Sequence, residues 1–258
     1  MAISRRHPAA LFAVLVVGLA TTGVAYAAVT TGTAPQAVAA SQTQVQEGKE
    51  LFLQGCSSCH GLAAQGGSDG PSLIGVGAAA VDFQVGTGRM PLAAPGAQAM
   101  PKMPVYNEEQ TAALAAYIAT LGAGPAIPTA DLLKTNEADL AIGGELFRTN
   151  CAQCHSFSGR GGALSEGRMA PSLMKSEAKR IYEAMITGPQ SMPVFNDKTI
   201  TPADKQAIIK YIQELQKQEN PGGFALGRLG TVTEGLFLFV VGLGALLVVA
   251  VWIGAKAK

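Results

Sequence analysis

The chain contains the motif Cys-x-x-Cys-His twice, at residues 56–60 and 151–155. The two copies account for all four cysteines and for two of the three histidines. This pentapeptide is the attachment signature of c-type haem, in which the thiols bind the haem covalently and the adjacent imidazole reaches the iron. Two covalent haem c groups are therefore predicted, bound through Cys56, Cys59, Cys151 and Cys154, with His60 and His155 as axial iron ligands.

Other uses of paired cysteines fit this pattern less well. A zinc site built from two Cys-x-x-Cys pairs separates them by about 15–20 residues, whereas here a domain-sized segment lies between them. A thioredoxin-like redox pair needs no following histidine, and a disulfide across two residues would be a poor structural cross-link. Haem attachment accounts for both cysteines and the histidine in each copy.

The two halves of the chain are similar beyond the haem motif. Gly, Glu, Leu and Phe stand at the same distances before the first cysteine, in Gly48–Phe52 and Gly143–Phe147. Pro-Ser-Leu follows at 71–73 and 171–173, Thr-Gly at 87–88 and 187–188, and an apolar, helix-prone segment with a tyrosine at 112–121 and 207–215. These matches predict an internal duplication with the period of a small domain. A haem would give each short unit the apolar centre that it could not build alone.

The order of parts in each half resembles the cytochrome c fold: a helix, the haem motif, a Gly/Pro-rich segment, a Met-Pro loop and a final helix. Strand patterning is nearly absent, so we expect an all-α fold with two tandem class I-like cytochrome c domains. The predicted boundaries are 1–28 for a signal peptide or uncleaved anchor, 29–45 for a polar spacer, 46–122 for the first domain, 123–137 for a linker, 138–219 for the second domain and 235–255 for a transmembrane helix.

The sixth iron ligand of the second haem is predicted to be methionine. The remaining histidine, His7, precedes an apolar segment at the far end of the chain, which excludes bis-histidine ligation within this chain. Met192, followed by proline, is the best candidate, and His/Met ligation raises the reduction potential of the iron. Met185 lies in a helix-like run and Met169 lies too close to the haem motif.

The first domain offers three Met-Pro pairs, at Met90, Met100 and Met103. Alignment of the two halves from the Thr-Gly pair favours Met90, because Thr87-Gly88-Arg89 precedes it. Alignment from the following Val-aromatic-Asn segment favours Met103 instead. At least two of the three must be packing residues, and the residues by themselves leave the choice open.

Both ends of the chain carry membrane signals. Residues 9–28 are apolar, follow two arginines and include a small-x-small site at 25–27, which fits a cleaved signal or an uncleaved anchor. Residues 236–255 form a second uncharged apolar run, long enough to span a bilayer. The terminal lysines favour a cytoplasmic C-terminus, so we expect the haem domains on the extracytoplasmic face of the cell membrane. A formal net charge of +1 argues against a nucleic-acid partner.

The whole layout resembles the diheme cytochrome c subunit of the actinobacterial cytochrome bc complex, a menaquinol–cytochrome c reductase. The matching segments are the two haem motifs, Thr87–Pro91 and Thr187–Phe195. In that family the first Met-Pro pair follows Thr-Gly-Arg directly, which selects Met90 as the ligand of the first haem. The resemblance implies a cytochrome b subunit and a Rieske iron–sulfur subunit as partners, with the Rieske subunit as electron donor. It also implies delivery of electrons to a terminal aa-type oxidase in the same supercomplex, with no bond chemistry in this chain and no catalytic residue.

Three other classes of protein compete with this interpretation. A diheme peroxidase needs an open or bis-histidine haem, which the number of histidines disfavours. The diheme subunit of a cbb-type oxidase is anchored ahead of its haem domains, and this chain has its clearest apolar run behind them. The cytochrome subunit of a periplasmic dehydrogenase usually has three haem motifs. An electron-transfer role inside a quinol-oxidising complex is the prediction that fits the layout.

Overall fold

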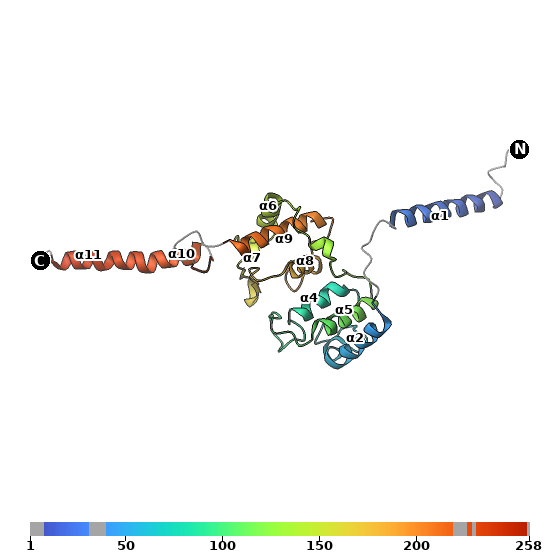
Figure 1. Ribbon diagram of the computed structural model, residues 1–258, viewed down its shortest axis with the longest axis horizontal. Helices are drawn as coiled ribbons and strands as arrows, with labels where there is room; N and C mark the ends of the chain where they lie inside the picture. The colour runs from blue at the N-terminus through green and yellow to red at the C-terminus, as the bar shows by residue number, and fades with distance from the viewer. Residues whose placement is uncertain (1–7, 31–39, 219–225, 229–230, 257–258) are drawn as a thin grey trace. The chain divides into compact units, whose positions relative to one another are not determined.

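The computed structural model describes residues 8–30, 40–218, 226–228 and 231–256 (Figure 1). Residues 1–39 form a unit separate from the rest, and its described element is helix α1 (Pro8–Thr30). The side chains of Phe12–Ala25 in this helix are exposed and mostly apolar. His7, residues 31–39 of the predicted spacer 29–45, and the last two residues lie outside the described residues. Whether the segment is a signal or an anchor stays a prediction.

The first haem domain consists of α2 (Gln42–Gly55), α3 (Ser57–His60), α4 (Gly77–Gly86) and α5 (Glu108–Thr120). The Ser41 hydroxyl accepts a hydrogen bond from the Gln44 amide and caps α2. Asn107 and Gln110 form a capping box at the start of α5, which satisfies amide groups that lack partners within the helix. Helices α2 and α4 both pack against α5, and the core lies between them.

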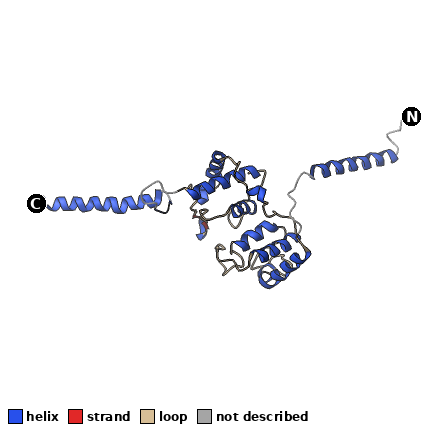
Figure 2. Ribbon diagram, in the orientation of Figure 1, coloured by secondary structure: helices blue, strands red, loops and turns tan. Residues whose placement is uncertain are grey.

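The second haem domain repeats this arrangement with α6 (Leu140–Asn150), α7 (Ala152–His155), α8 (Ala178–Thr187) and α9 (Pro202–Lys217). Thr201 and Asp204 form a capping box at α9, with Pro202 in its first turn. Figure 2 shows that helices and loops dominate the described chain. The predicted all-α class is therefore confirmed. A two-residue strand pair, β1 (Gly162–Ala163) and β2 (Met169–Ala170), with the short 3₁₀ turn Ser165–Gly167 between them, was not predicted.

In each domain the first and last helices cross at a glycine, and this glycine has the same position in both copies of the duplicated sequence. A Cβ on Gly48 would lie 1.9 Å from the Ala113 carbonyl oxygen, and a Cβ on Gly143 would lie 2.0 Å from that of Ala207. Any larger residue would push the helices apart, because these contacts are with backbone atoms. The crossing brings each motif phenylalanine against the tyrosine of the last helix: the ring centroids are 5.5 Å apart for Phe52–Tyr117 and 5.4 Å for Phe147–Tyr211.

The segment predicted as a linker, 123–137, packs against both haem domains. At its start, the Pro125 carbonyl accepts a hydrogen bond from the Ala79 amide at the beginning of α4. Farther along, the 3₁₀ helix η1 (Ala130–Leu133) contacts α8 and α9. The Thr135 hydroxyl donates a hydrogen bond to the Gln213 side-chain carbonyl at 3.0 Å. The connection is therefore a docked segment with its own contacts on each domain.

The C-terminal helix runs through α10 (Thr231–Phe237), the π-helical segment η4 (Leu238–Leu243) and α11 (Gly244–Lys256), preceded by η3 (Leu226–Arg228). Residues Thr233–Lys256 form one helix of 24 residues that is long and apolar enough to cross a membrane. None of its strongly apolar window is buried within the protein. The Lys256 ammonium lies 4.9 Å from the centre of the Trp252 ring, a pairing suited to a membrane interface.

Candidate haem-binding sites

Each haem motif forms a single helical turn directly after the first helix of its domain. The amide of Cys56 donates to the Phe52 carbonyl, and the amide of His60 donates to the Cys56 carbonyl at 3.0 Å. In the second domain the Cys151 amide donates to Phe147, and the His155 amide donates to the Cys151 carbonyl at 2.9 Å. Because the first cysteine and the histidine stand four positions apart in a helical turn, both side chains lie on one face.

The orientation of each motif histidine is fixed by a proline carbonyl. The Nδ1–H of His60 donates to the Pro71 carbonyl at 2.7 Å, and that of His155 donates to the Pro171 carbonyl at 2.8 Å. A carbonyl oxygen can only accept, so the proton must be on Nδ1. The Nε2 atom of each ring is therefore left with a free lone pair, the state that an iron ligand requires. The two Pro-Ser-Leu repeats thus have a structural role in the sites.

A glycine turn follows each motif and leads the chain back toward the histidine. Gly66 and Gly161 both have φ of +85°, a conformation that favours glycine. Their amides donate to the carbonyls of His60 and His155 at 2.8 and 2.9 Å. These turns bring the Pro-Ser-Leu segments over the imidazoles, which explains why both copies of the sequence need glycine shortly after the motif.

Burial favours the neutral forms of Cys151 and His155 in the second site. Burial, with a smaller contribution from Cys154, raises the pKa of the Cys151 thiol to about 11. Burial lowers the pKa of His155, against the opposing effect of its hydrogen bond to Pro171. In the first site burial likewise raises the pKa of Cys56. A neutral imidazole is the form that binds iron, so the surroundings of His155 favour the required state.

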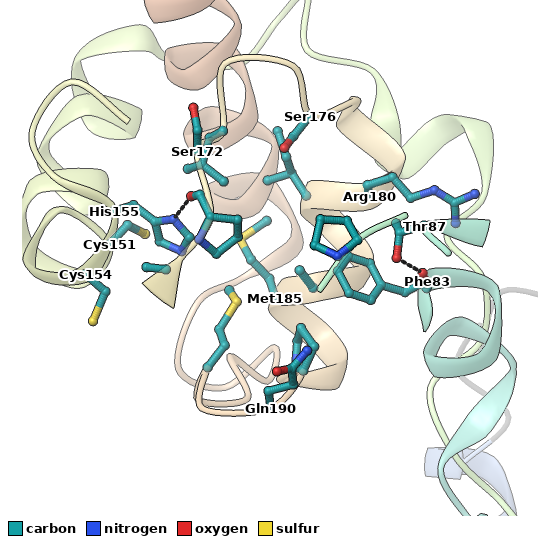
Figure 3. Close-up of a pocket in the computed structure, with 18 of the residues that line it drawn as sticks. Phe83, Thr87, Cys151, Cys154, His155, Ser172, Ser176, Arg180, Met185 and Gln190 are labelled. Atoms are coloured by element: carbon teal, nitrogen blue, oxygen red, sulfur yellow. Dashed lines mark hydrogen bonds between the residues drawn. The ribbon is translucent and has the colours of Figure 1, made fainter. Parts of the chain in front are cut away.

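The second site contains a cavity of about 600 Å³, within the ~300–1,000 Å³ typical of cofactor pockets. Its lining includes Cys151, Cys154, His155 and Met192, together with apolar side chains of α8 and α9. Figure 3 shows the cysteines and the histidine on one side of this space, with the His155 hydrogen bond drawn as a dashed line. A cavity of this size, bordered by two thiols, a free imidazole Nε2 and a thioether, fits a covalently attached haem.

The two predicted methionine ligands pack against the cores that also contact the first motif cysteines. In the second domain Met192 and Cys151 both pack against the buried cluster around Phe147. Met174 packs against this cluster too, but it does not line the cavity as Met192 does. In the first domain Met90 and Cys56 both pack against the cluster around Phe52. This pairing places the two predicted ligands on their respective cores.

The other candidate methionines differ in burial. Met100 and Met103 are 59% and 88% exposed. Met169 on strand β2 and Met185 on α8 line the second cavity as well, but Met169 is 54% exposed and Met185 is a buried member of the core cluster. The course of the backbone nevertheless keeps Met103 near the first site. A Cβ on Gly88 would meet Lys102 and Met103 backbone atoms, as a Cβ on the equivalent Gly188 would meet those of Met192.

The structure adds residues to the second site that the sequence did not indicate. Phe83, Gly86, Thr87 and Arg89 belong to the first domain, yet they line the cavity that contains Cys151. In Figure 3 Phe83 and Thr87 lie across this space from the motif cysteines. No spacing or motif in the sequence connects them with the second haem motif, because only the packing of α4 against α8 brings them there.

Comparisons with protein families match each half separately. Residues 45–122 match the family described as cytochrome c. Residues 138–212 match the family described as cytochrome c oxidase, cbb3-type, subunit III. Both matches include a haem motif, and each domain therefore has a covalent haem c as its cofactor.

Curated relatives match nearly the whole chain. A protein of Corynebacterium efficiens, named cytochrome bc1 complex cytochrome c subunit, is 43% identical over 94% of this chain and 88% of its own length. A protein of the same name from Corynebacterium diphtheriae is 44% identical, over 98% of this chain and 95% of its own length. A third, from Mycobacterium leprae, is 44% identical over 94% and 86%. The similarity thus spans both haem domains.

Proposed function

The chain belongs to the family of cytochrome bc1 complex cytochrome c subunits, and from this premise we propose that it is the diheme electron carrier of a quinol–cytochrome c reductase. In this role it takes electrons from the Rieske iron–sulfur subunit, beside a cytochrome b subunit, and delivers them to a terminal aa-type oxidase. The bound haem irons supply the one-electron oxidation and reduction. The chain itself carries out no bond chemistry and belongs to an enzyme as its electron-transfer subunit.

The proposed axial ligands are His60 and Met90 for the first haem and His155 and Met192 for the second. The observation that supports this assignment is the packing of Met90 with Cys56 and of Met192 with Cys151 on equivalent cores, with Met192 also lining the second cavity. Methionine ligation raises the iron potential, which suits a carrier placed between a quinol-oxidising centre and an oxidase. The proline carbonyls that orient both imidazoles hold the ligand geometry and so limit reorganisation.

The apolar helix Thr233–Lys256 is the proposed membrane anchor, with the C-terminus in the cytoplasm and both haem domains outside it. Anchoring the carrier beside its partners gives it a high effective concentration at both donor and acceptor. A freely diffusing cytochrome c would then be unnecessary. The glycines Gly242 and Gly244 permit close approach of a partner helix.

A second candidate function follows from the match of the second domain to a cbb3-type oxidase subunit. That match covers residues 138–212, whereas the bc1-complex relatives cover at least 94% of the chain in the three cases given above. The anchor candidate also follows the haem domains in the chain. These observations favour the bc1-complex role over the oxidase-subunit role.

The test is purification of the full chain from membranes through a tag, followed by mass spectrometry of its partners and quinol-driven oxygen uptake. We expect a cytochrome b, a Rieske protein and an aa-type oxidase to co-purify, and the haems to be reduced by menaquinol. A chain truncated before Gly235 should keep both haems but lose most quinol-driven flux at equal abundance. Co-purification with cbb-type oxidase subunits alone, or full flux from the truncated chain, would contradict the proposal.

A further inference from the structure

The second haem cavity is closed on one side by the first domain. Phe83 and Thr87 near the end of α4, and Arg89 just after it, line the cavity together with the second haem motif. The Arg89 guanidinium lies 4.8 Å from the centre of the Phe83 ring. A cofactor in this cavity would therefore be bordered by an aromatic ring and a cation that belong to the other domain.

A group of four ionisable residues joins α4 to α8 beside this cavity. We call Asp82, Lys179, Arg180 and Glu183 the interdomain clasp. The Asp82 Oδ2 atom lies 2.6 Å from Lys179 Nζ and 2.7 Å from Arg180 Nη1. Arg180 also donates to the Asp82 backbone carbonyl at 2.8 Å and to Glu183 Oε2 at 2.9 Å. One arginine thus contacts the side chain and the backbone of the opposite domain.

The two carboxyl groups of the clasp are buried, whereas Lys179 and Arg180 are 34% and 22% exposed, so the clasp differs from an ordinary surface ion pair on its acidic side. The side chain of Glu183 is fully buried and that of Asp82 is 8% exposed. Burial and the neighbouring Asp82 raise the pKa of Glu183 to about 9, so Glu183 is neutral near pH 7 and Asp82 carries the negative charge. Removing one member of such a group leaves an uncompensated buried charge, whereas surface pairs contribute little.

A second set of contacts holds the same two domains together. The Gln98 side chain donates to the Met169 carbonyl at 2.7 Å and accepts from the Met169 amide at 2.9 Å. The Gln190 side chain makes the same paired contacts with the backbone of Ala99, at 2.9 and 3.1 Å. These paired amide contacts fix the loop of the first domain against the rim of the second haem cavity, since Gln98 and Gln190 both line it.

Two adjacent residues of the chain also connect the two haem sites. Arg89 lines the second cavity, while its neighbour Met90 packs against the core of the first domain with Cys56. A single peptide link therefore separates the proposed ligand of the first haem from the wall of the second site. Displacing the first domain would move both features together.

We propose that the first domain forms one wall of the second haem site and that the interdomain clasp holds this wall closed. The clasp residues thereby position the two haem domains for electron transfer and keep water away from one side of the second haem. The inference rests on the proposed function for its purpose, but its structural content depends only on a haem in each domain.

The experiment uses the full chain with both haems, in detergent, and measures two properties. Spin labels at the exposed positions Glu109→Cys and Glu145→Cys report the distance between the domains, with both irons reduced. Redox titration reports the potential of each haem. The variants are Asp82→Asn, which removes a charge, and Gly86→Val, which keeps every charge but displaces Arg180, since even a Cβ there would lie 2.4 Å from its Nη2. The control is Asp131→Asn, whose ion pair with Lys134 is exposed.

We expect a narrow distance distribution in the parent and the control, and a broad one in both variants. The population of the closed arrangement relative to the open one should fall about tenfold or more, as expected for a broken buried pair. The potential of the second haem should fall, because water stabilises the ferric state, while that of the first haem changes less. An unchanged distribution in both variants would overturn the clasp, and a broadened distribution with an unchanged second potential would overturn the wall.

The failure of this inference and that of the proposed function are separable. The carrier role fails if menaquinol does not reduce the haems of the parent complex, whatever the distance between the labels. The clasp and the wall are tested by the distances between the spin labels and by the haem potentials of the isolated chain. Neither measurement depends on which partners the chain has.

Discussion

The two haem domains have the same helical frame but differ at the surfaces where they meet. With Thr87 aligned to Thr187, the clasp positions Lys179 and Arg180 of α8 correspond to two alanines of α4. Likewise Asp82 corresponds to a tyrosine and Glu183 to a phenylalanine. The core positions kept their apolar character, while the facing positions acquired opposite charge. The comparison teaches that the side chains that join the two domains are ones that the two copies do not share.

The loops that carry the proposed methionine ligands differ as well. The second domain passes directly from Thr187 to Met192 and Phe195, whereas the first domain inserts a long segment between Met90 and Tyr106. Part of this segment, around Gln98, contacts the second domain. An insertion in one copy therefore completes the site of the other, and it is also the source of the two extra Met-Pro pairs.

The largest expected effect is the loss of a haem when a motif is broken. Cys56→Ala with Cys59→Ala, or Cys151→Ala with Cys154→Ala, should each lower the mass of the denatured chain by one haem. If the second cavity depends on both domains, losing the second haem should also broaden the distribution of distances between the spin labels. Losing the first haem should broaden it less. Equal broadening in the two variants would remove the asymmetry between the domains.

Replacing the proposed methionine ligands distinguishes the two loops. Met192→Ala should abolish the charge-transfer band of methionine-ligated ferric haem in the second domain, and Met90→Ala should abolish it in the first. Met103→Ala is the matched control, because that side chain is 88% exposed and precedes proline as well. Loss of the band in the Met103 variant instead would identify Met103, in the inserted segment, as the ligand of the first haem.

Truncating the packed aromatics tests whether the two cores are equivalent. Phe52→Ala and Phe147→Ala should each destabilise their domain by about 3–5 kcal/mol, the usual cost of removing a buried phenylalanine. Chemical denaturation followed through each haem's absorbance measures the loss. A cost in one domain much below that in the other would show that the haem contributes unequally to the two cores.

A smaller effect is expected at the helix crossings. Gly48→Ala and Gly143→Ala should each cost about 1–3 kcal/mol, as typical for overpacking, because the new methyl group meets a backbone carbonyl. Gly96→Ala, in the inserted loop, is the control, since the nearest atom to its Cβ lies 4.0 Å away. Similar costs at the two crossings would confirm that the frames are interchangeable, and a cost at only one would contradict this.

The pH dependence of stability tests the clasp, which is the contact that distinguishes the two domains. Burial and Asp82 raise the pKa of Glu183 from its ordinary value of 4.5 to about 9. The folded chain therefore keeps a proton that the unfolded chain releases, so stability from this group falls as pH rises from about 4.5 to about 9. Glu183→Gln should flatten this dependence in denaturation curves of the second domain.

The contribution of Asp82 to stability depends on pH in the opposite direction. Its pKa lies below the ordinary 3.8, because hydrogen bonds from Glu183 and Lys179 and the charge of Arg180 outweigh the effect of burial. Its stabilisation is present above that value and is lost as the pH falls through the lowered pKa. The Asp82→Asn variant should therefore be less stable than the parent near pH 7 and approach it at acid pH, and a profile that matches the parent near pH 7 would contradict this assignment.

Much of this protein was determined by the sequence alone. The two pentapeptides predicted both haems, because covalent attachment needs fixed residue types at fixed local spacing. The repeated Gly, Phe and Tyr positions predicted the two helical units, because each of these residues packs the first helix of a domain against its last helix. The long uncharged run at 236–255 predicted a helix long enough to span a bilayer, because hydrophobic length is a property of the chain itself.

Only the tertiary structure decided what depends on contacts between distant residues. The orientation of His60 and His155 by Pro71 and Pro171 requires a turn that no motif records. The packing of Met90, rather than Met103, on the first core could not be read from two alignments that disagree. The clasp and the shared wall of the second cavity join residues about a hundred positions apart, such as Asp82 and Arg180. Burial gives these residues their pKa shifts and their energetic weight, and burial is set by how the two domains pack.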